Sequence, residues 1–286
     1  MSIRANYHKG WRAESRYSPD GYKADLAAHL YDRLNDDRGR IIPWLDHARP
    51  LRGSRILEIG CGTGSSTVAL AEQGAVVTAI DIDEDALLVA RDRCAAYGIE
   101  ATFMPLNSQR LIGAFQIGSF DLIVFFACLE HMTTQERLDS LRQAWDLLPS
   151  NGLLAIIETP NRLWFYDEHT SWLPLFHWLP NDLAFQYSKM SKRENFRELY
   201  RDYLPETKQH FLRRGRGMSF HEIDLAIAPV ATINVISSLE EFGKYPRGTV
   251  ALGKEFKAIM RRLLPDIHTG FFDEYLDLIF KKGERI

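Results

Sequence analysis

A glycine-rich turn between an apolar run and a helical pattern is the strongest constraint on how this chain folds. Residues 60–64 read Gly-Cys-Gly-Thr-Gly and follow the short apolar segment 55–59. Glycines at such a turn let the backbone bend sharply and approach a ligand without an intervening Cβ. The helical pattern that follows, over 67–73, directs unpaired N–H groups and its positive end at the same point. The sequence therefore predicts a ligand site between a strand and the next helix.

The segment from 55 to 157 alternates strand and helix patterns. Strands are expected at 55–59, 75–80, 101–106, 121–126 and 153–158, and helices at 67–73, at 85–97 and from Thr133 to Pro149. Gly74 and Gly98 are placed to end the first two helices. Thr133 and Glu136 have the spacing of a capping box for the third. Strands that alternate with helices imply a parallel, doubly wound sheet with ligands at the carboxyl ends of its strands.

The regions on either side of this segment have other patterns. Residues 1–52 are polar, aromatic and mostly helical in spacing, whereas the chain after residue 159 is rich in aromatic residues. A second capping-box form at Ser219–Glu222 predicts a short helix that reaches Ala226. Residues 231–236 are expected to form a sixth strand, and periodicity leaves 271–282 open as a strand or a helix.

The chain is therefore expected to be a Rossmann-like α/β protein. Its mostly parallel, doubly wound sheet has seven strands, with N-terminal helices and an aromatic-rich cap inserted after strand five. Four parts are expected: a helical cap at 1–52, a ligand-binding core at 53–159, the cap insertion at 160–218, and a C-terminal completion of the sheet at 219–286.

Composition excludes several classes of protein. The 286 residues carry a net charge of −3, which does not favour a general nucleic-acid or membrane-surface binder. The longest apolar run is far shorter than the roughly 20 residues of a membrane span. Cys61, Cys94 and Cys128 have no metal-ligand spacing and suggest free thiols in a reducing compartment. A cytoplasmic protein without membrane insertion is the simplest expectation.

The spacing around the glycine turn bears on the kind of ligand. A dinucleotide site prefers G-x-G-x-x-G, whereas here the pattern is G-x-G-x-G and Ser65 occupies the third glycine's position. Glu58 would repel a pyrophosphate but could pair with a sulfonium or an ammonium group. Asp81 ends the second strand, where a carboxylate can accept hydrogen bonds from ribose hydroxyls. Its alternative role, capping the next helix, is assigned instead to Asp83.

Four segments in order resemble the motifs of the class I S-adenosylmethionine-dependent methyltransferases. They are 57–67 with the glycine turn, 79–83 with the two aspartates, 120–131 with Leu129-Glu130-His131, and 148–154 before the fifth strand. The resemblance covers about residues 50 to 160. It implies that S-adenosylmethionine is the cofactor. The stretch 159–180, which begins Thr-Pro-Asn-Arg, resembles a bacterial methyltransferase subgroup, and this resemblance implies that the acceptor is a saccharide or another small metabolite.

The resemblance also implies a set of cofactor contacts. Asn107 stands where the family usually has an acidic residue that contacts the adenine amino group. Its amide oxygen can accept the same hydrogen bond. The full set is Glu58, Gly60, Cys61, Gly62, Gly64, Asp81, Ile82, Asn107, Ser108 and Phe126. Arg12 or Tyr22, from the N-terminal region, is expected to reach the methionine carboxylate.

His131 is the candidate general base, because it follows the fourth strand in the loop that faces the cleft. The alternative is a histidine that only packs at the start of a helix. Some quinone-biosynthesis O-methyltransferases carry E-x-x-L-E-H here and bind a metal. This chain keeps Glu130 and His131 but lacks the first glutamate, so no metal is expected.

The acceptor is expected at the aromatic segment that leaves the fifth strand. Eight aromatic residues lie between Trp164 and Tyr187. Aromatic faces suit a planar ring or a sugar. Tyr166 and His169 are the candidate acceptor contacts. The alternative is a hydrophobic cap that packs on the sheet, or a contact between two copies in a homodimer.

These observations together predict an enzyme, an S-adenosylmethionine-dependent methyltransferase that acts more readily on oxygen than on nitrogen. Two alternatives stay open. One is an NAD-dependent oxidoreductase, which Ser65 disfavours. The other is a protein that binds S-adenosylmethionine without transferring its methyl group.

Overall fold

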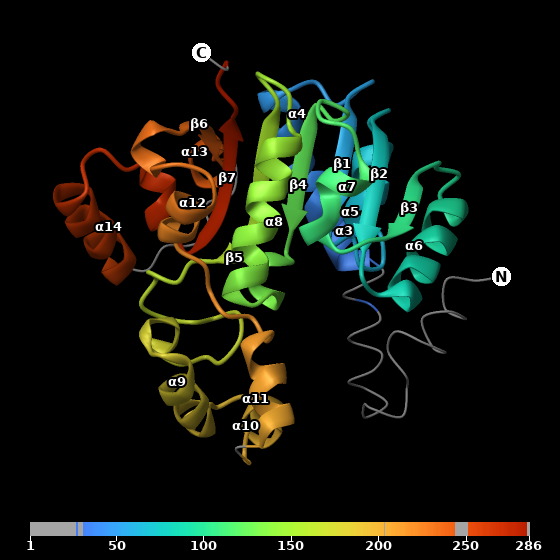
Figure 1. The fold of residues 1–286 in the computed structure, drawn as a ribbon. Helices are drawn as coiled ribbons and strands as arrows, with labels where there is room; N and C mark the ends of the chain where they lie inside the picture. Colours follow the sequence, from blue (N-terminus) through green and yellow to red (C-terminus); the bar gives the residue numbers. More distant parts are fainter. Residues whose placement is uncertain (1–26, 28–30, 203, 244–250, 285–286) are drawn as a thin grey trace.

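A seven-stranded sheet forms the centre of the computed structural model, which describes residues 27, 31–202, 204–243 and 251–284 (Figure 1). The strand order is β3-β2-β1-β4-β5-β7-β6, with β7 antiparallel to both of its neighbours. The strands are β1 (Arg55–Ile59), β2 (Val76–Asp81), β3 (Thr102–Pro105), β4 (Leu122–Phe126), β5 (Leu153–Pro160), β6 (Asn234–Ser238) and β7 (Tyr275–Lys281). The expected Rossmann-like, mostly parallel sheet is confirmed.

Helices cover both faces of this sheet. In β1, Ile56 and Leu57 belong to separate buried clusters because neighbouring side chains of a strand point to opposite faces. The cluster around Leu57 packs against α7 (Leu111–Ala114), α8 (Thr134–Leu147) and α12 (Phe220–Ala226). The cluster around Ile56 packs against α3 (Arg33–Asp36), α4 (Ile42–Ala48), α5 (Ser65–Ala71) and α6 (Glu84–Ala96). The result is the three-layered arrangement of a doubly wound fold.

The aromatic segment forms a separate cap with a small core of its own. In Figure 1 its helices α9 (Asn181–Tyr187), α10 (Glu194–Leu199) and α11 (Pro205–Leu212) lie together beyond the end of the sheet where β4 and β5 terminate. Phe176 lies edge-on to Phe196 and Phe211 at the centre of this core. Most aromatic side chains of the segment are therefore used in packing.

The last two strands differ from their expected bounds. The sixth strand begins at Asn234 rather than 231, because Val230–Thr232 forms a 3-10 turn. The tail, which periodicity left open, forms β7 after a 3-10 turn at Thr269–Phe272. Because β7 lies between β5 and β6 and is buried on both faces, its sequence lacks the alternation that marks a half-exposed strand.

The two predicted capping boxes have different outcomes. At α8 the Thr133 side chain and Glu136 cap each other as expected. At α12 the helix is present, but the Ser219 side chain accepts no capping hydrogen bond, so the second capping box is wrong. The physical reason is that Glu222 turns toward the buried Arg137, with a nitrogen–oxygen distance of 2.8 Å.

The N-terminal helical layer contains a π-helical turn. Between α3 and α4 the chain forms the turn η4 (Asp37–Ile41). A short π-helical insertion of this kind often occurs at functional sites.

Three further expectations concern the N-terminal region, the cysteines and membrane insertion. Arg12 and Tyr22 lie outside the described residues. The three cysteines are free and buried, as expected. Across the described ranges, no helix has the length and apolar character that a membrane span requires.

The remaining helices complete the C-terminal part of the described chain. The short α13 (Leu239–Phe242) follows β6, and α14 (Ala251–Leu263) lies at the left edge of the molecule in Figure 1, beyond α12 and α13. Lys257 of α14 is buried and forms ion pairs with Glu240 and Asp273. These ion pairs join α14 to α13 and to the segment before β7.

The contrast between the two capping sites is testable. Thr133→Ala removes a side-chain cap and should lower the free energy of unfolding by about 1 kcal/mol. Ser219→Ala is the matched control, because the same residue position in its helix makes no side-chain cap. Its effect should be less than half as large. Urea unfolding followed by circular dichroism measures both, and equal losses would contradict the assignment.

Candidate active site

A cavity of 660 Å³ lies at the carboxyl ends of the parallel strands. Its wall includes the N-terminal helical layer, the glycine turn after β1, the ends of β2, β4 and β5, and the segment after the cap. Nine of the residues expected from sequence line it, namely Gly60, Cys61, Gly62, Asp81, Ile82, Asn107, Ser108, Phe126 and His131. Four others do not: Glu58, Gly64, Tyr166 and His169.

The glycines of the turn have two different functions. Gly60 and Gly64 both have φ near +76°, and a Cβ at either position would overlap the side chain of a neighbouring residue. A Cβ on Gly64 would lie 2.8 Å from the Cβ of Ala90, and one on Gly60 would overlap Cys128. A Cβ on Gly62 would meet nothing within 4 Å. Gly60 and Gly64 thus permit the close packing of the turn, and Gly62 leaves its cavity side open.

Glu58 does not face the cavity, which corrects its expected role. Its side chain is fully buried and accepts hydrogen bonds from the hydroxyl groups of Ser66 and Thr67. Burial raises the pKa of Glu58 to about 7. The reason is strand alternation, since Glu58 shares a face with Ile56 and points toward α5. Its carboxyl group fixes the first turn of α5 onto β1.

Asp81 lines the cavity at the end of β2. Its Oδ2 accepts a hydrogen bond from the Gly62 amide at 2.8 Å, and its Oδ1 accepts one from the Asp83 amide at 2.9 Å. Burial raises the pKa of Asp81. Asp83 caps α6 by accepting from the amides of Asp85 and Ala86, so its predicted capping role is confirmed. A carboxylate has further lone pairs, so Asp81 can still accept hydrogen bonds from a ligand.

Three residues line the end of the cavity that is farther from β5, after strands β2 and β3. The amide oxygen of Asn107 accepts a hydrogen bond from the Gln109 amide at 2.9 Å. The hydroxyl group of Ser108 is within 2.7 Å of that of Ser140. The Ile82 side chain is 72% exposed although it is apolar, which is expected of a residue that a bound planar group would cover.

His131 lines the cavity from η6 (Leu129–His131), directly after β4. Its Nδ1 lies 3.1 Å from the carbonyl oxygen of Arg213. Because a carbonyl oxygen only accepts, the proton is assigned to Nδ1, and Nε2 is left with a lone pair. Nε2 lies 3.7 Å from Oε1 of Glu130. Glu130 is fully buried, and burial raises the pKa of its carboxyl group.

Metal binding is not indicated by the side chains that the structure describes. Among the residues of these ranges, no group of three or more histidine, cysteine, aspartate or glutamate side chains is arranged to hold a metal ion. The position that carries the first glutamate in the quinone-biosynthesis motif lies at Phe126 or Ala127, and both line the cavity without a ligating atom.

Sequence reasoning missed several charged residues of the cavity. Asp37 is 4% exposed, and its Oδ2 accepts a hydrogen bond from Ser65 at 3.0 Å. Glu158 has φ of +56° and forms an ion pair with Arg40 at 3.0 Å. Glu158 ends the strand that the sequence predicted at 153–158, so the pattern that found Asp81 could have found it as well. Asp37 lies on a distant helix, and only the tertiary fold brings it to the cavity.

Arg213 closes the cavity from the cap side. Its guanidinium group forms two hydrogen bonds of 2.6 Å with the carboxylate of Glu136. Its backbone carbonyl holds His131, as described above. The segment after the cap is thus joined to the start of α8 and to the candidate base.

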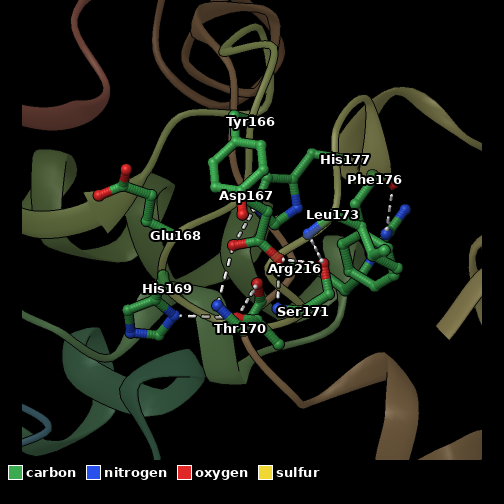
Figure 2. A network of polar contacts seen from close by, with 12 residues as sticks. Tyr166, Asp167, Glu168, His169, Thr170, Ser171, Leu173, Phe176, His177 and Arg216 are labelled. Carbon is green, nitrogen blue, oxygen red and sulfur yellow. Dashed lines mark hydrogen bonds and ion pairs between the residues drawn. The ribbon is translucent and has the colours of Figure 1, made fainter. Parts of the chain in front are cut away.

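Tyr166 and His169 are half-buried in the loop that follows β5 and do not line this cavity, so their role as acceptor contacts stays a prediction (Figure 2). The Tyr166 hydroxyl donates to the carbonyl of Trp172 at 3.1 Å. His169 places Nδ1 2.9 Å from the hydroxyl group of Thr170. Burial lowers the pKa of His169 to about 4. These contacts stabilise the loop between β5 and α9.

A buried carboxylate organises this loop. Asp167 accepts hydrogen bonds from the amides of Thr170 and Ser171 and from the Ser171 hydroxyl, at 2.7–2.9 Å (Figure 2). His177 places Nε2 3.3 Å from the same carboxylate. Burial alone would raise the pKa of Asp167, but His177 and these donors hold it well below its usual value. Arg216 then ties the loop to the chain after α11 by donating to the Phe176 carbonyl.

The comparison with known families follows this geometry. Residues 56–152 match a family model that is described as a methyltransferase domain. This segment belongs to the class I methyltransferase family. The methyltransferase domain therefore contains the glycine turn, Asp81, Asn107 and His131, which line the cavity.

The curated relatives are similar to the same part of the chain. The ubiquinone biosynthesis O-methyltransferase of Pseudomonas aeruginosa (strain LESB58) is 30% identical over 125 residues, which are 44% of this chain and 47% of the relative. The protein of the same name from Nitrosococcus oceani is 31% identical over the same shares. The chain thus spans about half the length of the curated relatives that it matches.

Solved structures show a partial likeness. The magnesium protoporphyrin IX methyltransferase ChlM from Synechocystis PCC 6803 with bound SAM has a TM-score of 0.40 and 22% identity, over 56% of this chain and 71% of that one. TrmN from Thermus thermophilus has a TM-score of 0.36 and 27% identity, over 41% and 36%. The shared part is limited in both.

The buried contact between Asp167 and His177 gives a stability prediction. Asp167→Asn replaces a buried carboxylate, which accepts several hydrogen bonds, by a neutral amide, and the free energy of unfolding should fall by about 1.5–3 kcal/mol at pH 7. Asp182→Asn is the control, because that carboxylate pairs with Lys208 while 67% exposed. The free energy of unfolding of this control should fall by less than about 1 kcal/mol.

The pH dependence follows from the lowered pKa of Asp167. The stability that a carboxylate with a lowered pKa contributes is present above its unfolded pKa of about 3.9 and is lost as the pH falls toward the folded pKa. The difference between wild type and Asp167→Asn should therefore shrink below about pH 4. Urea unfolding at several pH values measures it, and a constant difference would contradict the stabilising role of the ionised carboxylate.

Proposed function

We propose that this protein is an S-adenosylmethionine-dependent methyltransferase that transfers a methyl group to an oxygen atom of a small metabolite or saccharide. The observation that carries the proposal is the convergence of the methyltransferase domain's sequence motifs on one cavity. The glycine turn, the carboxylate at the end of β2 and the histidine after β4 all line it. In a doubly wound fold, this edge of the sheet is where ligands bind.

The charges of the cavity favour a cationic ligand over a nucleotide diphosphate. Seven acidic side chains but only two guanidinium groups line the cavity. The acidic residues are Asp32, Asp36, Asp37, Asp81, Asp83, Glu136 and Glu158, and the basic ones are Arg33 and Arg213. A pyrophosphate would be repelled by this excess of negative charge, whereas a sulfonium and an ammonium would be attracted. This excess is the main argument against an NAD-dependent oxidoreductase.

The positions of the polar groups fit a nucleoside at one end of the cavity. In our proposal Asp81 binds the ribose hydroxyls, Asn107 and Ser108 bind the adenine edge, and Ile82 covers the adenine face; that all four line the cavity supports this assignment. Gly62 and Cys61 then lie toward the methionine part. The cavity volume of 660 Å³ lies within the range of pockets for ligands of this size.

His131 supplies the chemistry that an oxygen acceptor needs. When bound, S-adenosylmethionine supplies an electrophilic methyl group. Nε2 of His131 would take the proton of the acceptor hydroxyl, while Nδ1–H stays on the Arg213 carbonyl. The carboxyl group of Glu130, 3.7 Å away, lies beside the imidazolium that forms. The products are the methylated acceptor and S-adenosylhomocysteine.

The acceptor class rests on the cap. The aromatic-rich insertion covers the carboxyl end of β5, and the segment after it reaches the cavity through Arg213. An insertion at this point selects the acceptor in our proposal. The three buried, free cysteines support a reducing, cytoplasmic setting.

Calorimetry tests the cofactor. S-adenosylhomocysteine should bind the purified protein, and NADH should give no binding heat. Asp81→Ala should weaken S-adenosylhomocysteine roughly ten- to a hundredfold, because it removes hydrogen bonds to a charged group. Asp85→Asn is the control, since Asp85 is exposed and does not line the cavity. Binding of NADH with no heat from S-adenosylhomocysteine would favour the oxidoreductase instead.

His131→Ala tests the general base. Formation of S-adenosylhomocysteine, measured with a panel of hydroxylated metabolites and saccharides, should fall about 10²–10⁴-fold for any acceptor that wild type methylates. Affinity for S-adenosylhomocysteine should stay within about twofold. If instead affinity falls and turnover at saturation is retained, His131 binds the cofactor and is not the base. Binding without turnover of any acceptor by wild type supports a non-catalytic protein.

A further inference from the structure

The wall of the cavity that faces the glycine turn comes from the N-terminal helical layer. Asp37 is the first residue of the π-helical turn η4, and its side chain reaches Ser65 at the start of α5. A π-helical insertion rotates the residues that follow it relative to a regular helix. Asp37 is 4% exposed, and its carboxyl group lines the cavity.

Asp37 lies near the end of the cavity opposite the nucleoside contacts. The groups that influence its charge include Ser65 of α5 and Glu158 at the end of β5. The candidate ribose and adenine contacts lie after β2 and β3, and the strand order places β5 on the other side of β1 and β4. Asp37 is therefore positioned beside the amino-acid part of the donor.

A carboxylate buried here needs a positive partner. Charges face Asp37 from each neighbouring element, namely Glu158 from β5, Glu58 from β1 and Arg33 from its own helical layer, while the Ser65 hydroxyl donates to it from α5. Arg33 is exposed, so its charge is screened by solvent. Burial and the two glutamates raise the pKa of Asp37 to about 8. Glu58 cannot serve a ligand, because it is closed off behind the turn.

We propose that Asp37 is the carboxylate that binds the α-ammonium group of the methyl donor, the role that Glu58 was expected to fill. This inference rests on the proposed function and deepens it, because it assigns a cationic subsite to a residue outside the methyltransferase domain. Donors and products that carry the amino-acid part are then selected by charge, and nucleosides that lack it lose this contact.

Binding of the ammonium group also moves a proton. In the free protein the raised pKa keeps the Asp37 carboxyl mainly protonated at pH 7. A cation in contact with Asp37 favours the carboxylate and lowers its pKa. The carboxyl proton passes to solvent, and the ligand keeps all of its own protons. At pH values well above the lowered pKa and at least one unit below pH 8, binding should release close to one proton.

Titration calorimetry with three probes tests the assignment. S-adenosylhomocysteine carries the ammonium and carboxylate, S-adenosyl-3-thiopropylamine carries only the ammonium, and 5′-methylthioadenosine carries neither. Asp37→Asn should weaken the first two about ten- to a hundredfold and leave the third within about twofold. Unchanged binding of 5′-methylthioadenosine also shows that the variant is folded. Asp85→Asn, which removes an exposed charge outside the cavity, should leave all three affinities unchanged.

Proton release supplies a second readout. Wild type titrated at pH 7 in two buffers of different ionisation enthalpy should release close to one proton with each of the two ammonium-bearing probes. Asp37→Asn should release almost none, and 5′-methylthioadenosine should release almost none from either protein. A merely structural Asp37 would not change the number of protons released.

The outcomes separate the inference from the function on which it rests. If wild type binds S-adenosylhomocysteine and Asp37→Asn binds it equally well, the inference is overturned and the proposed function stands. If the variant loses all three probes equally, Asp37 supports the fold rather than the ammonium group, and the inference is again overturned. Absence of binding by wild type overturns both.

Discussion

The close packing of the turn after β1 is the constraint on which the rest of the site depends. A side chain at Gly60 or Gly64 would collide with Cys128 or Ala90, so the chain can make this turn only without one. The amide of Gly60 donates to Ile80 on the neighbouring strand. Glu58 secures the other side of the turn by accepting hydrogen bonds from the start of α5. These contacts fix the amide and carbonyl groups around which the cavity is built.

Local patterns predicted most of the fold, because five parallel strands and their helices are each marked by periodicity, glycine stops and caps. The part that sequence reasoning left open depends on neighbours that lie far away along the chain. β7 is buried on both faces between β5 and β6, so its residues carry no alternation. Ser219 has the spacing of a cap, but the buried Arg137 draws Glu222 away from it. Such competition is visible only after packing.

The residues of the candidate site also fall into two groups, those that local sequence patterns could predict and those that they could not. Asp81 and His131 follow strands directly, and the carboxyl ends of parallel strands meet at one edge, so their convergence could be predicted. Glu58 was assigned to the cavity although strand alternation places it on the face of α5. Asp37 comes from a distant helical layer, and no local pattern connects it with the glycine turn. The aromatic cap segment suggested ring binding, but Phe176 and its neighbours are used in a core of their own.

The contacts of Arg213 couple the position of the chain after α11 to the orientation of His131. The guanidinium group of Arg213 is hydrogen-bonded to Glu136 at the start of α8, and its backbone carbonyl orients the imidazole of His131. Any shift of the chain that leaves the cap must therefore rotate the imidazole or release it. If His131 is the base that we propose, the position of the segment around Arg213 also determines where the proton-accepting nitrogen lies. A substitution that breaks the contact between Arg213 and Glu136 would then disturb the imidazole without touching it.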